Sequence, residues 1–261
     1  MLDPALPAPP VLEVDLGPGV RAAFTGRAGG TSPAPWSGLN LGLGVGDDAQ
    51  RVLGHRAAVG RLLGAPLVFG TQVHGAGVRV LTADDRAARV ERDAGAATCG
   101  EHDALVTAQP GLGLGVLVAD CVPVLLADPE ARVVGVAHAG RQGLLAGVVG
   151  TTLDALLAQG ARAGRVRAVV GPAACGRCYE VPEEMRDEVA ALRPGTGSTT
   201  SWGTPALDLP AGVVAELRAA GVAEIVETGI CTLEDERFYS HRLATRRGAT
   251  TGRFAGVVAL G

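Results

Sequence analysis

Two histidines and one cysteine of this sequence stand at the ends of apolar segments. His74 follows the apolar run that begins at residue 67, Cys121 separates two of the most apolar runs, and His138 follows another. Functional residues collect where strands end in loops. Three nitrogen and sulfur ligands with an open fourth position are typical of a catalytic zinc site, whereas a cysteine activated by a histidine is typical of a nucleophile. The spacing of the three residues leaves both interpretations open.

Asp120 directly precedes the thiol and also lies between apolar runs. A carboxylate buried there without a partner is unfavourable, so we predict that Asp120 has a specific partner and acts as an acid or base or supports the ligands. Simpler explanations exist for the others, because single histidines are often structural and free cysteines often fill space in a core. The hypothesis therefore requires the fold to bring His74, Cys121 and His138 together.

The remaining cysteines are Cys99, Cys175, Cys178 and Cys231. Cys175 and Cys178 have the Cys-x-x-Cys spacing of half a zinc ribbon or of a redox pair, but the sequence contains no second such motif. We therefore interpret them as a structural thiol pair close to the active site. Cys99 is interpreted as incidental, and Cys231 is expected to pack near the arginine-containing segment at the C-terminal end.

A frame of strands and helices must position these residues. Apolar runs broken by turn residues predict central strands buried on both faces, at Ala104–Thr107, Gly113–Ala119, Val122–Ala127 and Val133–Ala137. Further predicted strands are Val11–Asp15 and Val20–Thr25 as a hairpin, Leu67–Val73, Val78–Leu81, Val166–Val170, Ile225–Glu227 and Phe254–Leu260. Helices are predicted from the Asp47-Asp48 cap to Leu63, from His138 through Leu157, and over Glu183–Leu192 and Pro210–Ala220.

The segments between these elements are predicted loops, namely Gly26–Gly46, the polar stretch that ends at Glu101, and Gly195–Gly203. The order of elements indicates an α+β fold, a mixed α/β sandwich. The sequence has no internal repeat and no long linker, so we expect residues 1–261 to form a single domain with residues 1–19 as an N-terminal lead-in.

The composition restricts the partners. The net charge is −4, aromatic residues make up 3% of the chain, and no arginine-rich run exists, which argues against nucleic-acid binding. The most apolar stretch, Leu112–Ala127, contains an aspartate and a proline and falls short of a membrane span. The first residues lack the pattern of a secretion signal, so the five cysteines favour free thiols, metal ligands or a nucleophile over disulfides. We expect a cytoplasmic protein with no membrane partner.

Nine segments resemble, in the same order, the YfiH-type family from about residue 20 to the end of the chain. They are Phe24–Ser32, Leu39–Leu41, Thr71–Gly75, Ala119–Pro123, Ala137–Gly140, Gly171-Pro172, Cys178–Val181, Phe238–Arg242 and Thr251–Arg253. This family is regarded as one of purine nucleoside phosphorylases; it was formerly labelled a laccase-domain or multicopper polyphenol oxidase family and is also called peptidoglycan editing factor. The resemblance implies a fold similar to the bacterial toxin cysteine deamidases.

The resemblance also implies a zinc ion held by His74, Cys121 and His138. We expect Asp120 to act beside them, with these residues as the catalytic group, either as an acid or base or by supporting the ligands. The implied activities are phosphorolysis of adenosine, inosine and methylthioadenosine and deamination of adenosine, so the partners are a nucleoside and phosphate. Zinc suits deamination because a metal-bound water of lowered pKa attacks a purine carbon, whereas phosphorolysis needs an anion pocket. The implied substrate or phosphate contacts are Arg27, Asn40, Gln72, Arg141, Arg242 and Arg253. We expect a monomer or a small homo-oligomer.

Two positions depart from the family pattern. Family members usually continue after the histidine as Ala-Gly-Trp-Arg-Gly, whereas this chain has Arg141 followed by Gln142. Either Arg141 reaches the space of the expected arginine, or the phosphate site is weakened. A second arginine usually follows Arg242 directly, and here Arg246 or Arg247 is the candidate to replace it.

Three other functions fit parts of the pattern. The first is a Cys-His hydrolase or amidase with Cys121 as nucleophile, acting in the editing of peptidoglycan precursors. The second is a copper polyphenol oxidase, which the sequence favours less because multicopper sites need more than its five histidines. The third is a metal-holding scaffold for a partner protein, without enzymatic activity.

Overall fold

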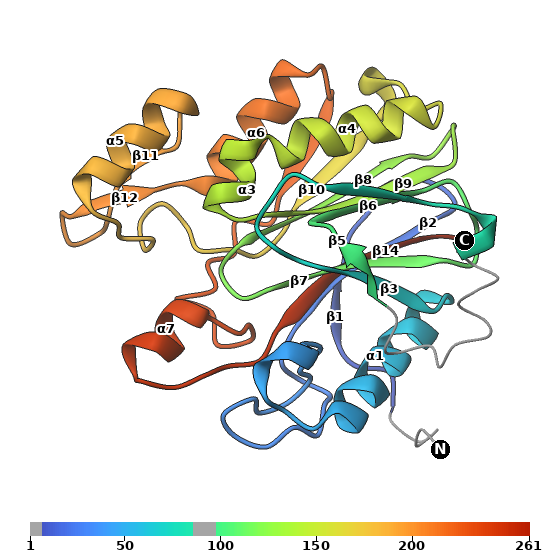
Figure 1. Cartoon of the computed structure of the whole chain (residues 1–261), viewed down its shortest axis with the longest axis horizontal. Coiled ribbons are helices and arrows are strands. Elements are labelled where there is room, and N and C mark those ends of the chain that lie inside the picture. The colour runs from blue at the N-terminus through green and yellow to red at the C-terminus, as the bar shows by residue number, and fades with distance from the viewer. Residues whose placement is uncertain (1–6, 86–97) are drawn as a thin grey trace.

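Two six-stranded sheets form the centre of the molecule (Figure 1), with the strand orders β1-β2-β14-β7-β3-β5 and β13-β10-β8-β9-β6-β4. The computed structural model describes residues 7–85 and 98–261. The first sheet contains β1 (Val11–Glu13), β2 (Val20–Thr25), β14 (Phe254–Leu260), β7 (Gly113–Val118), β3 (Leu67–Thr71) and β5 (Thr98–Glu101). The second contains β13 (Glu224–Glu227), β10 (Arg167–Val170), β8 (Val122–Asp128), β9 (Val133–Ala139), β6 (Ala104–Thr107) and β4 (Val78–Leu81).

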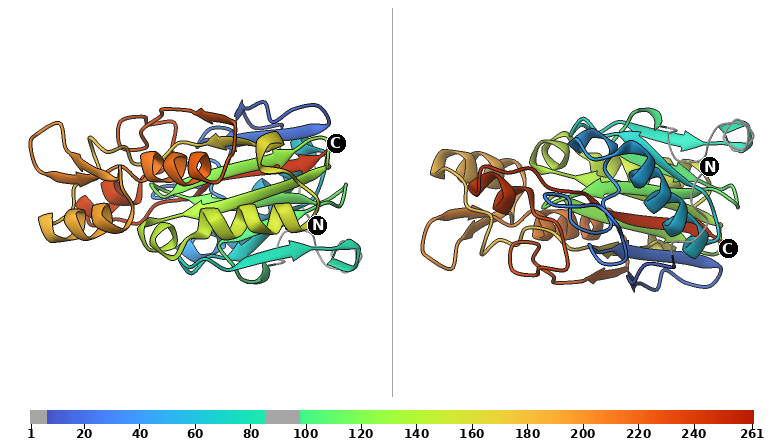
Figure 2. Two further views of the ribbon diagram at one scale, coloured as in Figure 1. Left: turned by 90° about the horizontal axis from the view of Figure 1, so that it is seen from above. Right: turned by 90° about the horizontal axis from the view of Figure 1, so that it is seen from below.

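Helices cover the outer faces of both sheets. The helices are α1 (Ala49–Leu63), α3 (Arg141–Ala146), α4 (Val148–Ala158), α5 (Glu183–Leu192), α6 (Leu209–Ala219) and α7 (His241–Arg246). Helices α5 and α7 lie beyond one end of the sheets (Figure 1). Helices α4 and α6 pack on the second sheet and α1 packs on the first, so the sheets lie between helices in Figure 1. The two views of Figure 2 look onto α4 and α6 from one side and onto α1 from the other. A small hairpin, β11 (Gly197–Thr199) with β12 (Pro205–Leu207), lies beside α5. This arrangement is the mixed α/β sandwich that the sequence predicts.

Central strands are buried on both faces, as their continuous apolar runs predict. In β8, Leu125 packs in the core between the two sheets, whereas its neighbours Val124 and Leu126 belong to the core under the helices. A strand with two dry faces has no solvent side that would select alternating polar residues. The strand ends that carry His74, Cys121 and His138 therefore emerge from a rigid, fully packed frame.

The structure confirms the predicted hairpin and the predicted start of the first helix, and it divides one predicted helix into two. The hairpin of β1 and β2 is antiparallel, and α1 begins after Asp48, whose side chain accepts a hydrogen bond from the backbone N–H of Arg51. The helix predicted after His138 is divided into α3 and α4 at Gly147, which adopts a φ of 86°.

Four elements were missed, one of them β12, which pairs with β11. The polar stretch that ends at Glu101 contains β5, which pairs in parallel with β3, and the predicted loop Gly195–Gly203 contains β11. Both strands have little apolar content, and their hydrogen-bonding partners rather than a local pattern define them. Helix α7 was also missed, because its six residues are too few for an apolar period to show.

Three strand ends differ from the prediction by two residues, the first being that of β1, which ends at Glu13 instead of Asp15. Strand β3 ends at Thr71 because the N–H of Val73 donates to the carboxylate of Asp103 instead of to a strand. Strand β9 continues to Ala139 because Ala139 pairs with Val122 and His138 pairs with Pro123 of β8. His138 is therefore the second-last residue of the strand. Among residues 7–85 and 98–261, no helix is long and apolar enough to cross a membrane.

Candidate metal centre

The fold brings His74, Cys121 and His138 together. Their potential ligand atoms all lie within 4.8 Å of one another, with the Cys121 Sγ atom 3.9 Å from His74 Nε2. The two imidazole rings meet edge to face with centroids 4.8 Å apart. Ligand atoms that share a tetrahedral zinc ion are roughly 3.3–3.6 Å apart, given the usual Zn–N and Zn–S bond lengths. The residues therefore need only a small inward shift to hold a metal ion.

Each of the three residues comes from a different connection. His74 lies in the turn between β3 and β4, and Cys121 lies between β7 and β8, where the chain passes from the first sheet to the second. His138 lies at the end of β9, where it is 2% exposed. Two sheets thus supply one centre, which the sequence spacing alone does not disclose.

A buried carboxylate, Asp103, organises the centre. Its Oδ1 atom lies 2.8 Å from His138 Nδ1 and accepts the backbone N–H of His74 at 2.9 Å. Its Oδ2 atom accepts the N–H groups of Val73 and Gly75 at 3.1 and 2.8 Å. Because the ionised carboxylate of Asp103 accepts a hydrogen bond from the Nδ1–H group of His138, the Nε2 atom of His138 is left to bind a metal. These bonds outweigh the burial of Asp103 and lower its pKa.

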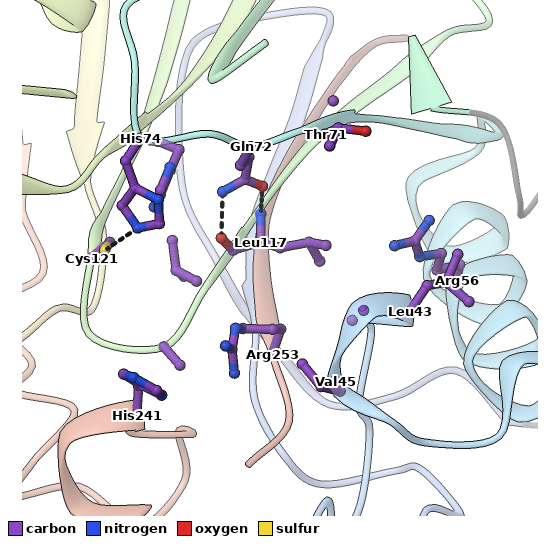
Figure 3. A pocket seen from close by; sticks show the side chains of 16 residues that line it. Leu43, Val45, Arg56, Thr71, Gln72, His74, Leu117, Cys121, His241 and Arg253 are labelled. Atoms are coloured by element: carbon purple, nitrogen blue, oxygen red, sulfur yellow. Dashed lines mark hydrogen bonds between the residues drawn. The ribbon is translucent and has the colours of Figure 1, made fainter. Parts of the chain in front are cut away.

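The same carboxylate stabilises an unusual backbone at His74. His74 has a φ of 60°, in the left-handed region that side chains other than glycine rarely adopt. Such a conformation is strained by about 1–3 kcal/mol and persists only where the surroundings hold it. Three consecutive N–H groups bound to Asp103 supply that constraint, and they direct the imidazole of His74 toward Cys121 (Figure 3).

Gly140 leaves room for the centre. A Cβ atom at this position would lie 2.8 Å from His74 Cδ2 and 3.1 Å from the sulfur of Cys121. Since Gly140 has an ordinary φ of −77°, the reason for glycine here is space and not backbone conformation. The packing therefore excludes any side chain between α3 and the ligand atoms.

The electrostatics of the centre favour a thiolate. Burial opposes ionisation of Cys121, but the charge and hydrogen bond of His138, with a further contribution from His74, lower the pKa of the thiol to about 6. Burial likewise opposes protonation of His138, but Cys121 and Asp103 raise its pKa to about 9. Without a metal, the centre therefore holds a thiolate beside an imidazolium at neutral pH. The same atoms suit a metal ion or an activated thiol nucleophile.

The centre opens into a cavity of about 500 Å³ (Figure 3). Such a volume is typical of a site for a small organic molecule. Its walls combine apolar side chains, including Leu43, Val45 and Leu117, with the cationic side chains of Arg56 and Arg253 and the ring of His241. In Figure 3, His74 and Cys121 lie at one side of the lining, Arg56 lies at the opposite side, and Arg253 lies between them.

Two of the predicted substrate contacts line this cavity. The amide of Gln72 accepts the N–H of Leu117 at 2.7 Å and donates to its carbonyl at 2.8 Å, which continues the β3–β7 pairing past the end of β3. Arg253 donates to the carbonyls of Thr251 and Gly252, and burial lowers the pKa of its guanidinium.

Two others, Asn40 and Arg27, lie outside the lining of this cavity. Asn40 is fully buried, and its amide binds the backbone of Gly42 and Arg253 and the carboxylate of Asp47. It therefore holds the turn that carries Leu43 against the segment that carries Arg253. The guanidinium of Arg27 lies over the ring of Tyr239, 5.0 Å from its centroid.

Asp120, predicted as an acid or base or as a support of the ligands, and the remaining predicted contacts, Arg242 and Arg141, also lie outside the lining. Asp120 accepts hydrogen bonds from the Thr232 hydroxyl at 2.7 Å and from the Arg242 backbone at 2.6 Å, so both carboxylate oxygens bind the C-terminal segment. The guanidinium of Arg242 donates to the carbonyl of Glu180 and lies over the ring of Tyr179. Arg141, the first residue of α3, does not line the cavity among the described residues.

Sequence reasoning missed Asp103, Arg56 and His241. Asp103 had a weak signal, since it is an acidic residue immediately before a strand predicted to be buried on both faces. Arg56 lies in the middle of α1, and its Nε donates to the carbonyl of Leu41 while its guanidinium lies over Phe69. His241 begins the short helix α7 within the Phe238–Arg242 segment.

Fold and site together define a mixed α/β protein with a preformed His-Cys-His centre at the base of a small-molecule cavity. Residues 21–261 match the family described as multi-copper polyphenol oxidoreductase laccase, and the chain belongs to this family. It is 52% identical to purine nucleoside phosphorylase ORF3 of Streptomyces griseus over 240 residues, which cover 90% of this chain and 92% of that protein.

Two further similarities bear on the chemistry and the fold. Adenosine deaminase RL5 of an unknown prokaryotic organism is 36% identical over 256 residues, which cover 92% of this chain and 94% of that protein. The crystal structure of the Bacillus licheniformis hypothetical protein YfiH has a TM-score of 0.82 with 33% identity, and covers 93% of each chain. These similarities confirm the predicted family and the predicted fold class.

Replacing Asp103 by asparagine should weaken metal binding. An asparagine offers one acceptor oxygen, and its NH₂ group would face N–H donors that now bind a carboxylate. We expect the zinc affinity of Asp103→Asn to fall by about 10–100-fold, measured by competition with a chromophoric chelator. Asp187→Asn, at an exposed position on α5, is the matched control and should bind zinc as the unmodified chain does. Equal affinities for the two variants would contradict the role of Asp103.

Cys121 should be reactive at unusually low pH in the metal-free protein. We expect the rate of its alkylation by iodoacetamide to rise through pH 6 and to level off above it, because the thiol is ionised above a pKa of about 6 instead of the ordinary 9.0. Mass spectrometry of the Cys121 peptide measures the rate at each pH. In His138→Ala the inflection should move to higher pH, since the stabilising imidazolium is lost. An inflection near the ordinary value in the unmodified chain would refute this electrostatic description.

Proposed function

We propose that this chain is a zinc-dependent purine nucleoside phosphorylase that also deaminates adenosine. The observation that carries the proposal is a cavity whose lining contains both the His74–Cys121–His138 group and the cationic side chains of Arg253 and Arg56. The relatives named purine nucleoside phosphorylase and adenosine deaminase support the same pair of reactions.

The donor set supports zinc as the metal. Two imidazoles and a thiolate with an open fourth position resemble the ligands of catalytic zinc enzymes, and Asp103 orients His138 as a ligand-supporting carboxylate does. When bound there, zinc would supply Lewis-acid polarisation and a lowered pKa for water. A multicopper centre needs more histidine ligands than the two of this group. His55 does not supply another, because both of its ring nitrogens are hydrogen-bonded, one to the N–H of Thr31 and the other to the carbonyl of Asn40.

For deamination, the chain must place C6 of adenosine near His74 and Cys121 and move protons. Ammonia leaves as a water-derived oxygen replaces it, so a group near the centre must accept and return a proton. The apolar side chains Leu43, Val45 and Leu117 give the purine a dry surface on the cavity wall. Asp120, bound to Thr232 and Arg242, is proposed to hold the Cys121 loop in position.

For phosphorolysis, phosphate attacks C1′ of the ribose, the bond from C1′ to N9 breaks, and the purine leaves with a proton. The phosphate must be held against the sugar, and arginine suits this role because its guanidinium binds phosphate oxygens through two parallel donors. Arg253 is the candidate because it lines the cavity. Its position is fixed by a hydrogen bond from its backbone N–H to the side-chain oxygen of Asn40. Neither Gln142, which is exposed, nor Arg141 lines the cavity among the described residues, so the phosphate-binding role is assigned in this proposal to Arg253.

Within this proposal the protein is a single domain in the cytoplasm, a monomer or small homo-oligomer that binds no nucleic acid. The alternative of a Cys-His amidase uses Cys121, His138 and Asp103 as a nucleophile, base and orienting carboxylate. The two proposals differ in whether metal is needed, which the first experiment below decides.

Metal-replete protein should release hypoxanthine from inosine only when phosphate is present, and should convert adenosine to inosine without phosphate. Cys121→Ala should lose both activities because it lacks a metal ligand, whereas Cys99→Ala, at a cysteine outside the centre, should retain them. Chromatographic analysis of bases and nucleosides measures both reactions. Unchanged turnover in Cys121→Ala, or amide hydrolysis that survives metal removal, would contradict the proposal.

Arg253→Gln should separate the two reactions. Loss of a charge-assisted hydrogen bond costs about 1.5–3 kcal/mol, so we expect the KM for phosphate to rise by about 10–100-fold. Deamination of adenosine in phosphate-free buffer should change little, because it uses no phosphate. Arg186→Gln is the matched control, since that arginine pairs with Glu183 and Asp187 on α5. Equal losses in both reactions would assign Arg253 to the nucleoside instead of to phosphate.

A further inference from the structure

A second group of metal-binding side chains lies outside the cavity. The ligand atoms of Cys175, Cys178, Cys231 and Glu234 all lie within 4.8 Å of one another. Cys178 and Cys231 are buried, Cys175 is half-buried and Glu234 is exposed. Neither the Cys-x-x-Cys motif nor Cys231 has a part in the proposed chemistry.

The backbone arranges these residues as two equivalent turns. The carbonyl of Cys175 accepts the N–H of Cys178 at 3.0 Å, and the carbonyl of Cys231 accepts the N–H of Glu234 at 3.1 Å. Each turn therefore presents its first and fourth residues on one side, as Cys-x-x-Cys and Cys-x-x-Glu. The turns lie side by side because Ala173 and Cys231 form a parallel bridge. The sequence motif lacks a second Cys-x-x-Cys, and the second turn supplies its equivalent.

We propose that these four residues form a structural zinc site. Three thiolates and a carboxylate complete a four-coordinate set, and structural zinc sites are closed by protein ligands in this way. A disulfide within the chain would pair two of the three cysteines and leave the third unpaired, whereas one metal ion can bind all three thiolates. Zinc bound by three thiolates and a carboxylate carries a net charge of −2, and Arg177 lies against it with its Nη2 atom 3.8 Å from Glu234.

Both turns contact the walls of the catalytic centre. Thr232 follows Cys231 directly, and its hydroxyl binds the carboxylate of Asp120, which precedes Cys121. The N–H of Ala174, next to Cys175, donates to the carbonyl of Asp120 at 2.9 Å. A metal ion that joins the two turns would therefore fix the loop that presents Cys121. The second site would act on the first by positioning and not by chemistry.

Metal counting on the purified full chain tests the proposal independently of any enzymatic activity. We expect two zinc ions per chain in the unmodified protein and one in Cys121→Ala, which leaves the second site intact. Cys178→Ala/Cys231→Ala should also bind one, and Cys99→Ala, the control, should bind two. Elemental analysis after reconstitution with zinc under reducing conditions gives these ratios.

Cobalt substitution in Cys121→Ala identifies the ligands, because that variant retains only the proposed second site. We expect intense sulfur-to-cobalt charge-transfer absorption, which should persist with weaker cobalt binding in Cys121→Ala/Glu234→Gln. The proposal is overturned if Cys121→Ala binds neither zinc nor cobalt. It is also overturned if peptide mapping of the protein purified without reductant finds a disulfide among Cys175, Cys178 and Cys231. These results do not depend on the nucleoside reactions, so the two proposals fail separately.

Discussion

The site depends on one buried carboxylate. Asp103 has no exposed surface, and a charge in that position is tolerated only if hydrogen bonds replace its hydration. The N–H groups of the 73–75 turn and the imidazole of His138 supply those bonds. The requirement acts in both directions, because the turn adopts the left-handed conformation at His74 only while the carboxylate holds it. One interaction thereby connects the start of β6, the end of β3 and the end of β9.

The two sheets explain why these connections meet. Strand β7 belongs to the first sheet and β8 to the second, so the chain crosses between the sheets at Cys121. His74 follows a strand of the first sheet, and His138 ends a strand of the second. Because β8 and β9 are buried on both faces, their ends cannot move without opening two cores. A centre built across this junction is held by the packing of the whole sandwich.

The sequence predicts elements whose burial produces a local apolar pattern, but it does not predict contacts between residues that are far apart along the chain. Continuous apolar runs disclosed the central strands, and the ends of those runs disclosed His74, Cys121 and His138. Asp103 was missed because its partners lie about 30 residues away on either side, at His74 and His138, and no local spacing records such pairs. Strands β5 and β11 were missed for a related reason, since their partners define them. The predicted contacts Asn40, Arg27 and Arg242 were recognised as a group, but only the structure separates residues that line the cavity from residues that support it.

The two parts of the cavity also differ in how they are held, which bears on how the two proposed reactions relate. The metal centre is fixed by Asp103 and by the exclusion of any side chain at Gly140, so its geometry leaves little freedom. Arg253 is held at its backbone by Asn40 and at its guanidinium by neighbouring carbonyls, on the segment that enters β14. Deamination needs only the first part, whereas phosphorolysis needs phosphate beside the sugar and hence the second as well. Changes on the arginine segment therefore alter phosphorolysis first, while changes around Asp103 alter every reaction that uses the metal. If the proposed function holds, substitutions on the arginine segment would shift the balance of the two reactions in this chain without any change in its metal ligands.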